Sequence, residues 1–340
     1  MDLSIVDLSP VREGETATDA YENTISLAKL AERVGYERFW VAEHHGMADS
    51  IAGTTPEVLI GHLVARTEEI RLGSGTVLLN HYSPFKVAEA FGVLDSLAPD
   101  RIDLGLGRAT GIPAADSALQ TSRVSENPDR DHAEKIEAVA NHLYDGFGDD
   151  HAYADLTLAR SGAGPPDLWV LGSSPSSAKI AGELGLRYCF AAFIRPTFAE
   201  RAFEVYRDAF EPSSIGAGPD DPHGMLAINA ACAETDREAA RLRATAEASY
   251  KRMQRGVVGS MPSVETAISE LGDVPEPTPA ELQDGQWPRA ISGDPDTLAG
   301  LLEQLTDRVG VSEVMVQNLV ADHEDVLRSH ELLSEGVGLE

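Results

Sequence analysis

A carboxylate and two histidines follow directly after an apolar run in the segment FWVAEHHG, residues 39–46. Burying a polar group costs free energy unless the group is hydrogen-bonded, so the presence of Glu43, His44 and His45 beside a core needs an explanation. Histidine titrates near neutral pH, which suits it to acid–base chemistry. Adjacent strand residues point to opposite faces, so the two histidines are not expected to reach one ligand together. The alternative is a structural pair in which Glu43 binds the backbone.

The segment VLGSSPSSAKIAG has the composition of a phosphate site. Gly172, Ser173, Ser174 and Ser177 lie between a predicted strand and a helix that begins near Pro175. A helix N-terminus presents free N–H groups and the positive end of the helix dipole, and the serine hydroxyls add donors. Plain N-capping by serine is the alternative, and the local pattern leaves both open.

Two further segments place glycines or an arginine at strand ends. Arg108 follows the run DLGLG, where a guanidinium can bind a phosphate through two hydrogen bonds or form an ordinary surface ion pair. Gly73, Ser74 and Gly75 lie inside the predicted strand IRLGSGTVLL. Glycine in a strand often marks a bulge or the close approach of a ligand. The alternative there is a small residue that makes room for a neighbouring helix.

The elements that must position these residues alternate between short β-rich runs and amphipathic helical runs. Strands are predicted at residues 3–9, 38–45, 70–79, 101–109, 167–174, 186–193, 225–234 and 312–320. A helical run follows each strand, and in the first third strands begin about every 30 residues, the length of a βα unit. This order predicts an α/β protein, a (β/α)8 TIM barrel formed by residues 1–340 as a single domain. Polar segments at about 110–130, 146–166 and 257–292 are predicted insertions.

In such a barrel, functional side chains gather at the carboxyl ends of the strands, where the residues described above lie. A doubly wound open sheet is the competing architecture. It would normally carry a glycine-rich dinucleotide turn after the first strand, and the segment DLSPVREGE is not one. No metal site is expected, because the histidines lack the spacing of a zinc protease helix and no HxH or carboxylate set ends the strands.

The amino-acid composition indicates the solvent in which the protein works and the kinds of partner that it is not expected to bind. The chain has 56 Asp and Glu against 27 Lys and Arg, a formal net charge of −29. Such a surface repels itself at low ionic strength, which predicts a salt-rich, halophilic cytoplasm and disfavours nucleic-acid binding. No apolar run approaches the roughly 20 residues that cross a bilayer, so no membrane partner is expected. Cys189 and Cys232 are predicted to be buried free thiols.

Taken together, these segments resemble the bacterial luciferase-like family of flavin-dependent oxidoreductases. The matching segments are EHHG, GSGTVLLNHYSPFKVAEAFGVLDSLAPDRIDLGLGR, GSSPSSAKIAGELGL and the C-terminal LVADHEDVLRSHELL. The resemblance extends from Ile5 to about Leu333. It implies a (β/α)8 barrel that holds reduced FMN, or in one branch a deazaflavin, at its mouth.

The resemblance also assigns roles to individual residues. His44 matches a histidine that assists proton transfer and oxygen chemistry beside the flavin ring. Gly75 and Thr76 match a dipeptide that adopts a non-proline cis bond in many members. Arg108 matches an arginine near the flavin phosphate, and the serine-rich turn matches the phosphate-binding turn. The residues of that turn are Gly172, Ser173, Ser174 and Ser177.

The activity implied by the resemblance is monooxygenation of a small, aldehyde-like organic substrate by reduced FMN and oxygen. A flavin reductase supplying reduced FMN and a homodimeric assembly are expected with it. Deazaflavin-dependent hydride transfer and a non-catalytic flavin-binding protein are the alternatives. The sequence departs from luciferase at Gly107, where luciferase itself has a reactive cysteine, and the loop ATGIPAADSALQTS after Arg108 lacks an aromatic residue for ring stacking.

Overall fold

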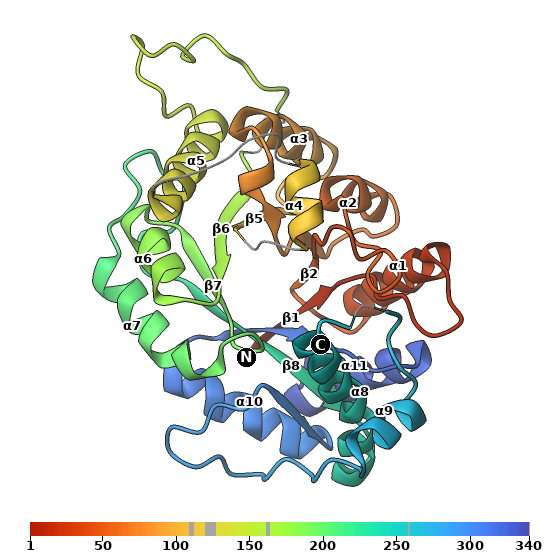
Figure 1. Cartoon of the computed structure of the whole chain (residues 1–340). Coiled ribbons are helices and arrows are strands. Elements are labelled where there is room, and N and C mark those ends of the chain that lie inside the picture. The colour runs from red at the N-terminus through yellow and green to blue at the C-terminus, as the bar shows by residue number, and fades with distance from the viewer. Residues whose placement is uncertain (109–111, 120–126, 161–163, 258, 340) are drawn as a thin grey trace.

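The computed structural model describes residues 1–108, 112–119, 127–160, 164–257 and 259–339. Within them, one parallel sheet closes into a barrel in the order β1-β2-β3-β5-β6-β7-β8-β10, because β10 pairs with both β8 and β1 (Figure 1). The strands are β1 (Asp2–Asp7), β2 (Arg38–Val41), β3 (Arg71–Ser74), β4 (Val77–Leu78), β5 (Ile102–Gly107), β6 (Asp167–Gly172), β7 (Arg187–Ala191), β8 (Gly224–Cys232), β9 (Ala290–Gly293) and β10 (Glu313–Gln317).

Helices surround this barrel on the outside (Figure 1). They are α1 (Ala17–Arg33), α2 (Pro56–Val64), α3 (Pro84–Leu97), α4 (Pro113–Leu119), α5 (Pro128–Leu143), α6 (Pro175–Glu183), α7 (Ala199–Ala209), α8 (Asp236–Gln254), α9 (Val264–Leu271), α10 (Pro295–Val309) and α11 (His323–Val337), with short 3-10 turns η1 (Leu79–His81) and η2 (Pro196–Phe198). Six of the helices begin at a proline, which lacks the N–H group that the first turn would leave unpaired. Side chains of Asn127, Ser174 and Asp294 cap three of these six.

The predicted (β/α)8 TIM barrel is confirmed, and each predicted strand range overlaps one barrel strand. The predicted strand 70–79 is interrupted: β3 ends at Ser74, the Gly75–Thr76 bond is cis, and β4 resumes at Val77 to pair with β5. Strand β9 was not predicted. It pairs with residues 229–232 of β8, beyond the part of β8 that pairs with β10. Its four residues form too short an apolar run to stand out in a polar segment.

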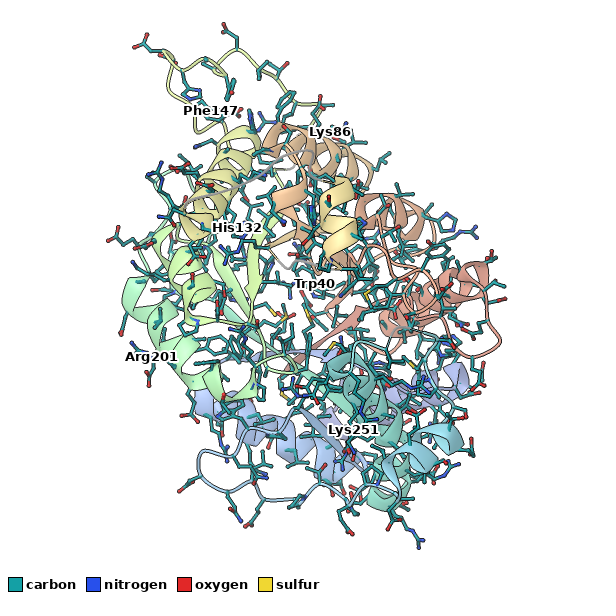
Figure 2. The ribbon with its side chains drawn as sticks, in the orientation of Figure 1. Trp40, Lys86, His132, Phe147, Arg201 and Lys251 are labelled. Atoms are coloured by element: carbon teal, nitrogen blue, oxygen red, sulfur yellow. The ribbon has the colours of Figure 1, made fainter. Side chains whose placement is uncertain are left out.

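Two of the three predicted insertions, the first and the third, contain regular structure where they are described. Helix α4 lies in the first, α9 and most of β9 lie in the third, and residues 109–111, 120–126, 161–163 and 258 lie outside the described residues. The second insertion projects from the body beyond α5, and Phe147 lies on this projection (Figures 1 and 2). No helix in the described part of the chain is long and apolar enough to cross a membrane.

An ion network fills the amino-terminal end of the barrel. The Arg38 guanidinium lies 2.7 Å from the Glu313 carboxylate, and Arg71 lies 2.9 Å from Asp103 and 3.0 Å from Asp167. All five are among the first two residues of their strands. Strand starts that meet at one end of a parallel barrel therefore bring these charges together.

An apolar layer follows above the ion network. Trp40 and Trp169 meet edge to face with ring centroids 5.7 Å apart, beside Met225 and Met315. A Cβ atom at Gly73 would lie 2.4 Å from the Trp40 ring. Gly73 therefore makes room for Trp40 inside the barrel rather than for a neighbouring helix. Figure 2 shows Trp40 toward the middle of the ring of helices.

Candidate functional site

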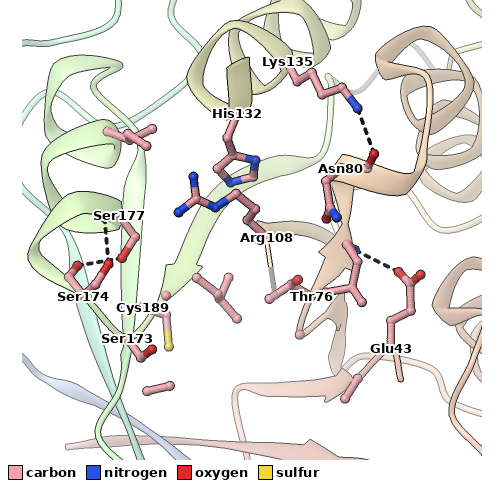
Figure 3. A pocket seen from close by; sticks show the side chains of 18 of the residues that line it. Glu43, Thr76, Asn80, Arg108, His132, Lys135, Ser173, Ser174, Ser177 and Cys189 are labelled. Carbon is pink, nitrogen blue, oxygen red and sulfur yellow. Dashed lines mark hydrogen bonds between the residues drawn. The ribbon is translucent and has the colours of Figure 1, made fainter. Parts of the chain in front are cut away.

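A cavity of about 1720 Å³ opens at the carboxyl ends of the barrel strands. Its wall combines residues from the ends of β1, β2, β5, β6, β7 and β10 with residues of α5 and α6 (Figure 3). Sites for drug-sized ligands usually measure about 300–1,000 Å³. This cavity therefore has room for a cofactor and a second small molecule.

The EHHG segment divides into an anchoring part and a cavity-facing part. The buried Glu43 carboxylate accepts hydrogen bonds from the backbone N–H of Leu78 (2.9 Å) and from the Tyr82 hydroxyl (2.6 Å), and His45 Nε2 lies 2.5 Å from it. Glu43 thus ties β4 and η1 to the end of β2. For Glu43 and His45, the structure shows the alternative that the sequence left open, a structural pair in which Glu43 binds the backbone.

His44 lines the cavity, as Glu43 also does, but its ring is not tied to other elements in the described part of the chain. Its backbone N–H donates to the Gly53 carbonyl at 2.8 Å, which fixes the residue at the end of β2. Its ring Nδ1 is buried and has no hydrogen-bond partner among the described residues. Burial, together with the neighbouring His45, lowers the pKa of His44 to about 4. The imidazole is therefore neutral at pH 7 and can exchange a proton with a bound molecule.

The Gly75–Thr76 bond forms another part of the wall. The bond is cis, as the resemblance implies, and both residues line the cavity. A Cβ atom at Gly107 would lie 2.5 Å from Thr76 Oγ1. The Thr76 side chain thus occupies the space that any larger residue at position 107 would need, which accounts for the glycine where luciferase itself has a cysteine.

The serine-rich turn lies between β6 and α6, and its four predicted residues all line the cavity. The Ser174 hydroxyl caps α6 by accepting from the Ser177 N–H at 3.3 Å, and the Ser177 hydroxyl donates to the Ser174 carbonyl at 2.7 Å. A Cβ atom at Gly172 would lie 2.1 Å from Ser177 Oγ. N-capping is therefore present, and the same turn also forms a tight, hydroxyl-rich cradle with Ser173 on the cavity wall.

Arg108 lines the cavity beside that turn and is paired with Asp129 at the start of α5. The Ser176 hydroxyl donates to the same carboxylate at 2.7 Å. These two partners hold the pKa of Asp129 below its ordinary value. The ion pair is solvent-exposed, with 38% of the Arg108 side chain and 52% of the Asp129 side chain accessible. Asp129 therefore links the ends of β5, α5 and α6 around the cavity.

Two cavity residues on α5 were missed in the sequence. His132 is 6% exposed, and burial, Arg108 and Lys135 lower its pKa to about 4. Lys135 Nζ donates to the backbone carbonyls of Leu79 (2.9 Å) and Tyr82 (3.0 Å), which ties α5 to η1. The two residues are three apart and share one helix face. The spacing of three residues could have identified them as neighbours on a helix. The helix was overlooked because its first residues fall in the predicted insertion, which extends to about residue 130.

Cys189 and Cys232 are buried free thiols, as predicted. Cys189 lies in the cavity wall, and burial raises its pKa well above the ordinary value. Among the described residues, no group of three or more His, Cys, Asp or Glu side chains has an arrangement that could hold a metal ion. Aromatic residues that the loop after Arg108 lacks reach the cavity from elsewhere, namely Phe85, Tyr153 and Phe193.

This chain is similar in sequence to known monooxygenases. The family model described as luciferase-like monooxygenase matches residues 1–313. The N-acetyl-S-alkylcysteine monooxygenase of Bacillus subtilis (strain 168) is 37% identical over 336 residues, covering 98% of each chain. The luciferase-like monooxygenase of Escherichia coli (strain K12) is 34% identical over 334 residues, covering 97% of this chain and 95% of that one.

Solved structures share the fold. The crystal structure of apo-MsnO8 is 39% identical, has a TM-score of 0.89 and covers 100% of this chain and 99% of that chain. The oxygenating constituent of 3,6-diketocamphane monooxygenase from Pseudomonas putida, in complex with FMN, is 21% identical over 99% of this chain and 97% of that one, with a TM-score of 0.72. An F420-dependent secondary alcohol dehydrogenase is 16% identical over 99% and 98%, with a TM-score of 0.65. FMN and F420 are thus both bound by proteins of this fold.

Proposed function

The chain belongs to the luciferase-like monooxygenase family, and on this premise we propose that it is an oxygenase that uses reduced FMN and oxygen to oxidise a small organic substrate. The observation that carries the proposal is His44, a neutral imidazole whose buried Nδ1 is unpaired among the described residues at the wall of a large cavity. A buried polar atom without a protein partner usually serves water or a ligand. An acid–base group beside a cofactor site fits that description.

The residues present also fit the flavin phosphate. Gly172 lets the Ser177 side chain pack directly against the strand end, and Ser173, Ser174 and Ser177 all line the cavity there. The start of α6 adds backbone N–H groups, and Arg108 adds a positive charge. We propose that these residues hold the phosphate and that Gly75 and Thr76 contact the ring.

Reduced FMN, when bound, supplies the electrons that activate oxygen. The chain's own contribution is to orient that group, to exclude water and to move a proton through His44. Glu43 holds the end of β2 and η1 in place, so that the neighbouring imidazole keeps its position at the wall. Proton transfer by a positioned group typically contributes about 10²–10⁴-fold to rate.

The first test is an anaerobic titration of the protein with reduced FMN, oxidised FMN and a deazaflavin, followed by fluorescence. The titration is made in molar salt, because salt screens the mutual repulsion that a net charge of −29 produces. Preferential binding of reduced FMN supports the proposal. Preferential binding of the deazaflavin supports hydride transfer, the second candidate, which is favoured by the F420-dependent relative of the same fold.

Catalysis is tested by oxygen uptake and product formation with aldehydes and with N-acetylated thioethers. The second class is included because of the N-acetyl-S-alkylcysteine monooxygenase relative. Flavin binding without substrate-dependent oxygenation would leave the non-catalytic flavin-binding alternative. In His44→Gln, we expect FMN binding to remain and product formation to fall by about 10²-fold or more. Wild-type coupling of flavin oxidation to product in this variant would contradict the role of His44.

Two protein partners are proposed. A flavin reductase would supply reduced FMN, because the segment DLSPVREGE after the first strand is not the glycine-rich turn that binds a dinucleotide such as NAD(P)H. A homodimer would cover Val58 on α2 and Val93 and Leu97 on α3, three exposed apolar residues on two helices that pack together. Light scattering of the wild type and of Leu97→Glu tests the dimer: the wild type should have twice the mass of the variant.

A further inference from the structure

We propose, on the basis of the flavin-binding function proposed above, that His132 is a further phosphate-binding residue and that it binds the phosphate as an imidazolium. Cofactor binding would then be coupled to proton uptake from solvent, and the site would prefer a phosphomonoester with two negative charges.

The position of His132 is the first part of the evidence. The residue lines the cavity, is 6% exposed, and has a buried Nδ1 with no hydrogen-bond partner among the described residues. Figure 3 shows its imidazole directly beside the Arg108 side chain, with both side chains directed into the pocket. A buried nitrogen in such a place needs an acceptor or donor from a ligand. The adjacent Arg108 and the serine-rich turn make that ligand an anion.

The charged groups that act on His132 come from two elements, and two further elements contribute polar groups to the same cavity. On its own helix, Lys135 is a cation and Asp129 an anion, and at the end of β5 Arg108 is a cation. Helix α6 contributes the hydroxyls of Ser176 and Ser177, and η1 contributes the amide of Asn80. Burial and the two cations favour the neutral imidazole while the site is empty.

A bound phosphate reverses this balance. A phosphomonoester carries close to two negative charges above its second pKa, which lies near 6. Such a group beside His132 favours the imidazolium, which then donates a charge-assisted hydrogen bond. At pH 7 the free phosphate is already mostly dianionic, so the proton on His132 in the complex must come from solvent. A phosphate esterified on both sides carries one charge and would favour the imidazolium less.

The experiment is isothermal titration calorimetry of the wild type at pH 7 with oxidised FMN and with riboflavin, in two buffers of different ionisation enthalpy. Salt is held constant throughout. For FMN we expect uptake of a measurable fraction of a proton, and for riboflavin, which lacks the phosphate, none. In His132→Gln we expect no proton uptake and at least a tenfold weaker FMN affinity, with riboflavin affinity unchanged. His62→Gln, at an exposed position, is the matched control and should behave as the wild type.

A second measurement needs no variant. The ³¹P NMR signal of bound FMN should keep the chemical shift of a dianion below pH 6, because the proton resides on His132 rather than on the phosphate. Equal proton uptake in wild type and His132→Gln, or a monoanionic bound phosphate at pH 5.5, would overturn the inference and leave the flavin-binding function intact. Failure of the wild type to bind either FMN or riboflavin would overturn both.

Discussion

The two ends of the barrel treat their polar residues in opposite ways. At the amino-terminal end, the Asp103 carboxylate accepts hydrogen bonds from Arg71 and from Trp169 Nε1, and Glu313 is paired with Arg38. At the carboxyl end, His44 and His132 each keep a buried ring nitrogen without a partner among the described residues. Arg38 Nε and His223 Nε2 near the amino-terminal end also lack a hydrogen-bond partner among the described residues, but they do not line the cavity. The carboxylates of that end are paired with arginines, whereas the unpaired nitrogens of His44 and His132 lie where a ligand can reach them.

An unpaired buried atom does not suffice to mark a site. His330 Nε2 also lacks a partner in the described part of the chain, but this residue packs against Tyr36 and does not line the cavity. The difference lies in access, because a ligand can reach only the atoms of the cavity wall. The carboxyl end differs from the rest of the core because its unpaired nitrogens also lie in the wall of a cavity.

The largest effect should come from breaking the amino-terminal end. Asp103 is 0% exposed, and Asp103→Asn removes the negative charge that faces Arg71 and Arg38. In this variant Arg38 keeps Glu313 and Arg71 keeps Asp167 as partners. Breaking a buried ion pair typically costs about 3–5 kcal/mol, so we expect a loss near the lower end of that range in the free energy of unfolding. Urea denaturation measures it, with Asp149→Asn on the exposed surface as the control. A loss below about 1 kcal/mol, the contribution of an exposed ion pair, would show that the buried ion network does not stabilise the amino-terminal end of the barrel.

Acid should weaken the carboxyl end next. The pKa values of His44 and His132 are lowered to about 4 in the folded protein, against an ordinary value of 6.5. Between these values the unfolded chain binds more protons than the folded protein, so the free energy of unfolding falls as the pH falls from 6.5 to 4. Each histidine contributes up to about 3 kcal/mol to this fall.

Urea denaturation at several pH values checks the acid effect. The slope of unfolding free energy against pH should be smaller in His44→Gln and in His132→Gln than in the wild type, because glutamine does not titrate. His62→Gln should leave the slope unchanged, since that residue is exposed in both states. An unchanged slope in the two cavity variants would show that these histidines are not held neutral.

The phosphate cradle should respond to a single added carbon. Gly172→Ala places a Cβ atom where Ser177 Oγ lies 2.1 Å away, so Ser177 must move. We expect FMN affinity to fall about tenfold, equivalent to about 1.4 kcal/mol, and riboflavin affinity to change little. Fluorescence titration measures both. Gly148→Ala, at a glycine with open space around its Cβ position, is the control. Unchanged FMN affinity would remove this turn from the phosphate site.

The smallest effect should come from the exposed ion pair at the carboxyl end. Arg108–Asp129 has the same chemistry as the Arg71–Asp103 pair but is solvent-exposed. Exposed pairs contribute about 0–1 kcal/mol, so Asp129→Asn should lower the free energy of unfolding by no more than that. Thermal and urea unfolding measure it beside Asp103→Asn. Equal losses in the two variants would mean that burial does not separate the two pairs.

Much of the barrel was predictable because its signals are local. Strand and helix runs repeat at the length of a βα unit, and proline after a capping residue marks the starts of α5, α6 and α10. The position of His44 at the end of a strand follows from the same periodicity, since strand ends meet at one face of a barrel. The same periodicity predicts that the serine-rich turn joins a strand to a helix.

Tertiary structure alone decided which polar groups are paired. Glu43 is an anchor because Leu78 and Tyr82, more than 30 residues away, donate to it, whereas His44 faces the cavity. Gly73 is explained by the Trp40 ring, and His132 gains its surroundings from Arg108 on another element. The sequence by itself determined the order of the elements and the ends at which they meet. Pairing, burial and charge depend on neighbours distant in the chain, so only the folded barrel separates the residues that close it from those left for a ligand.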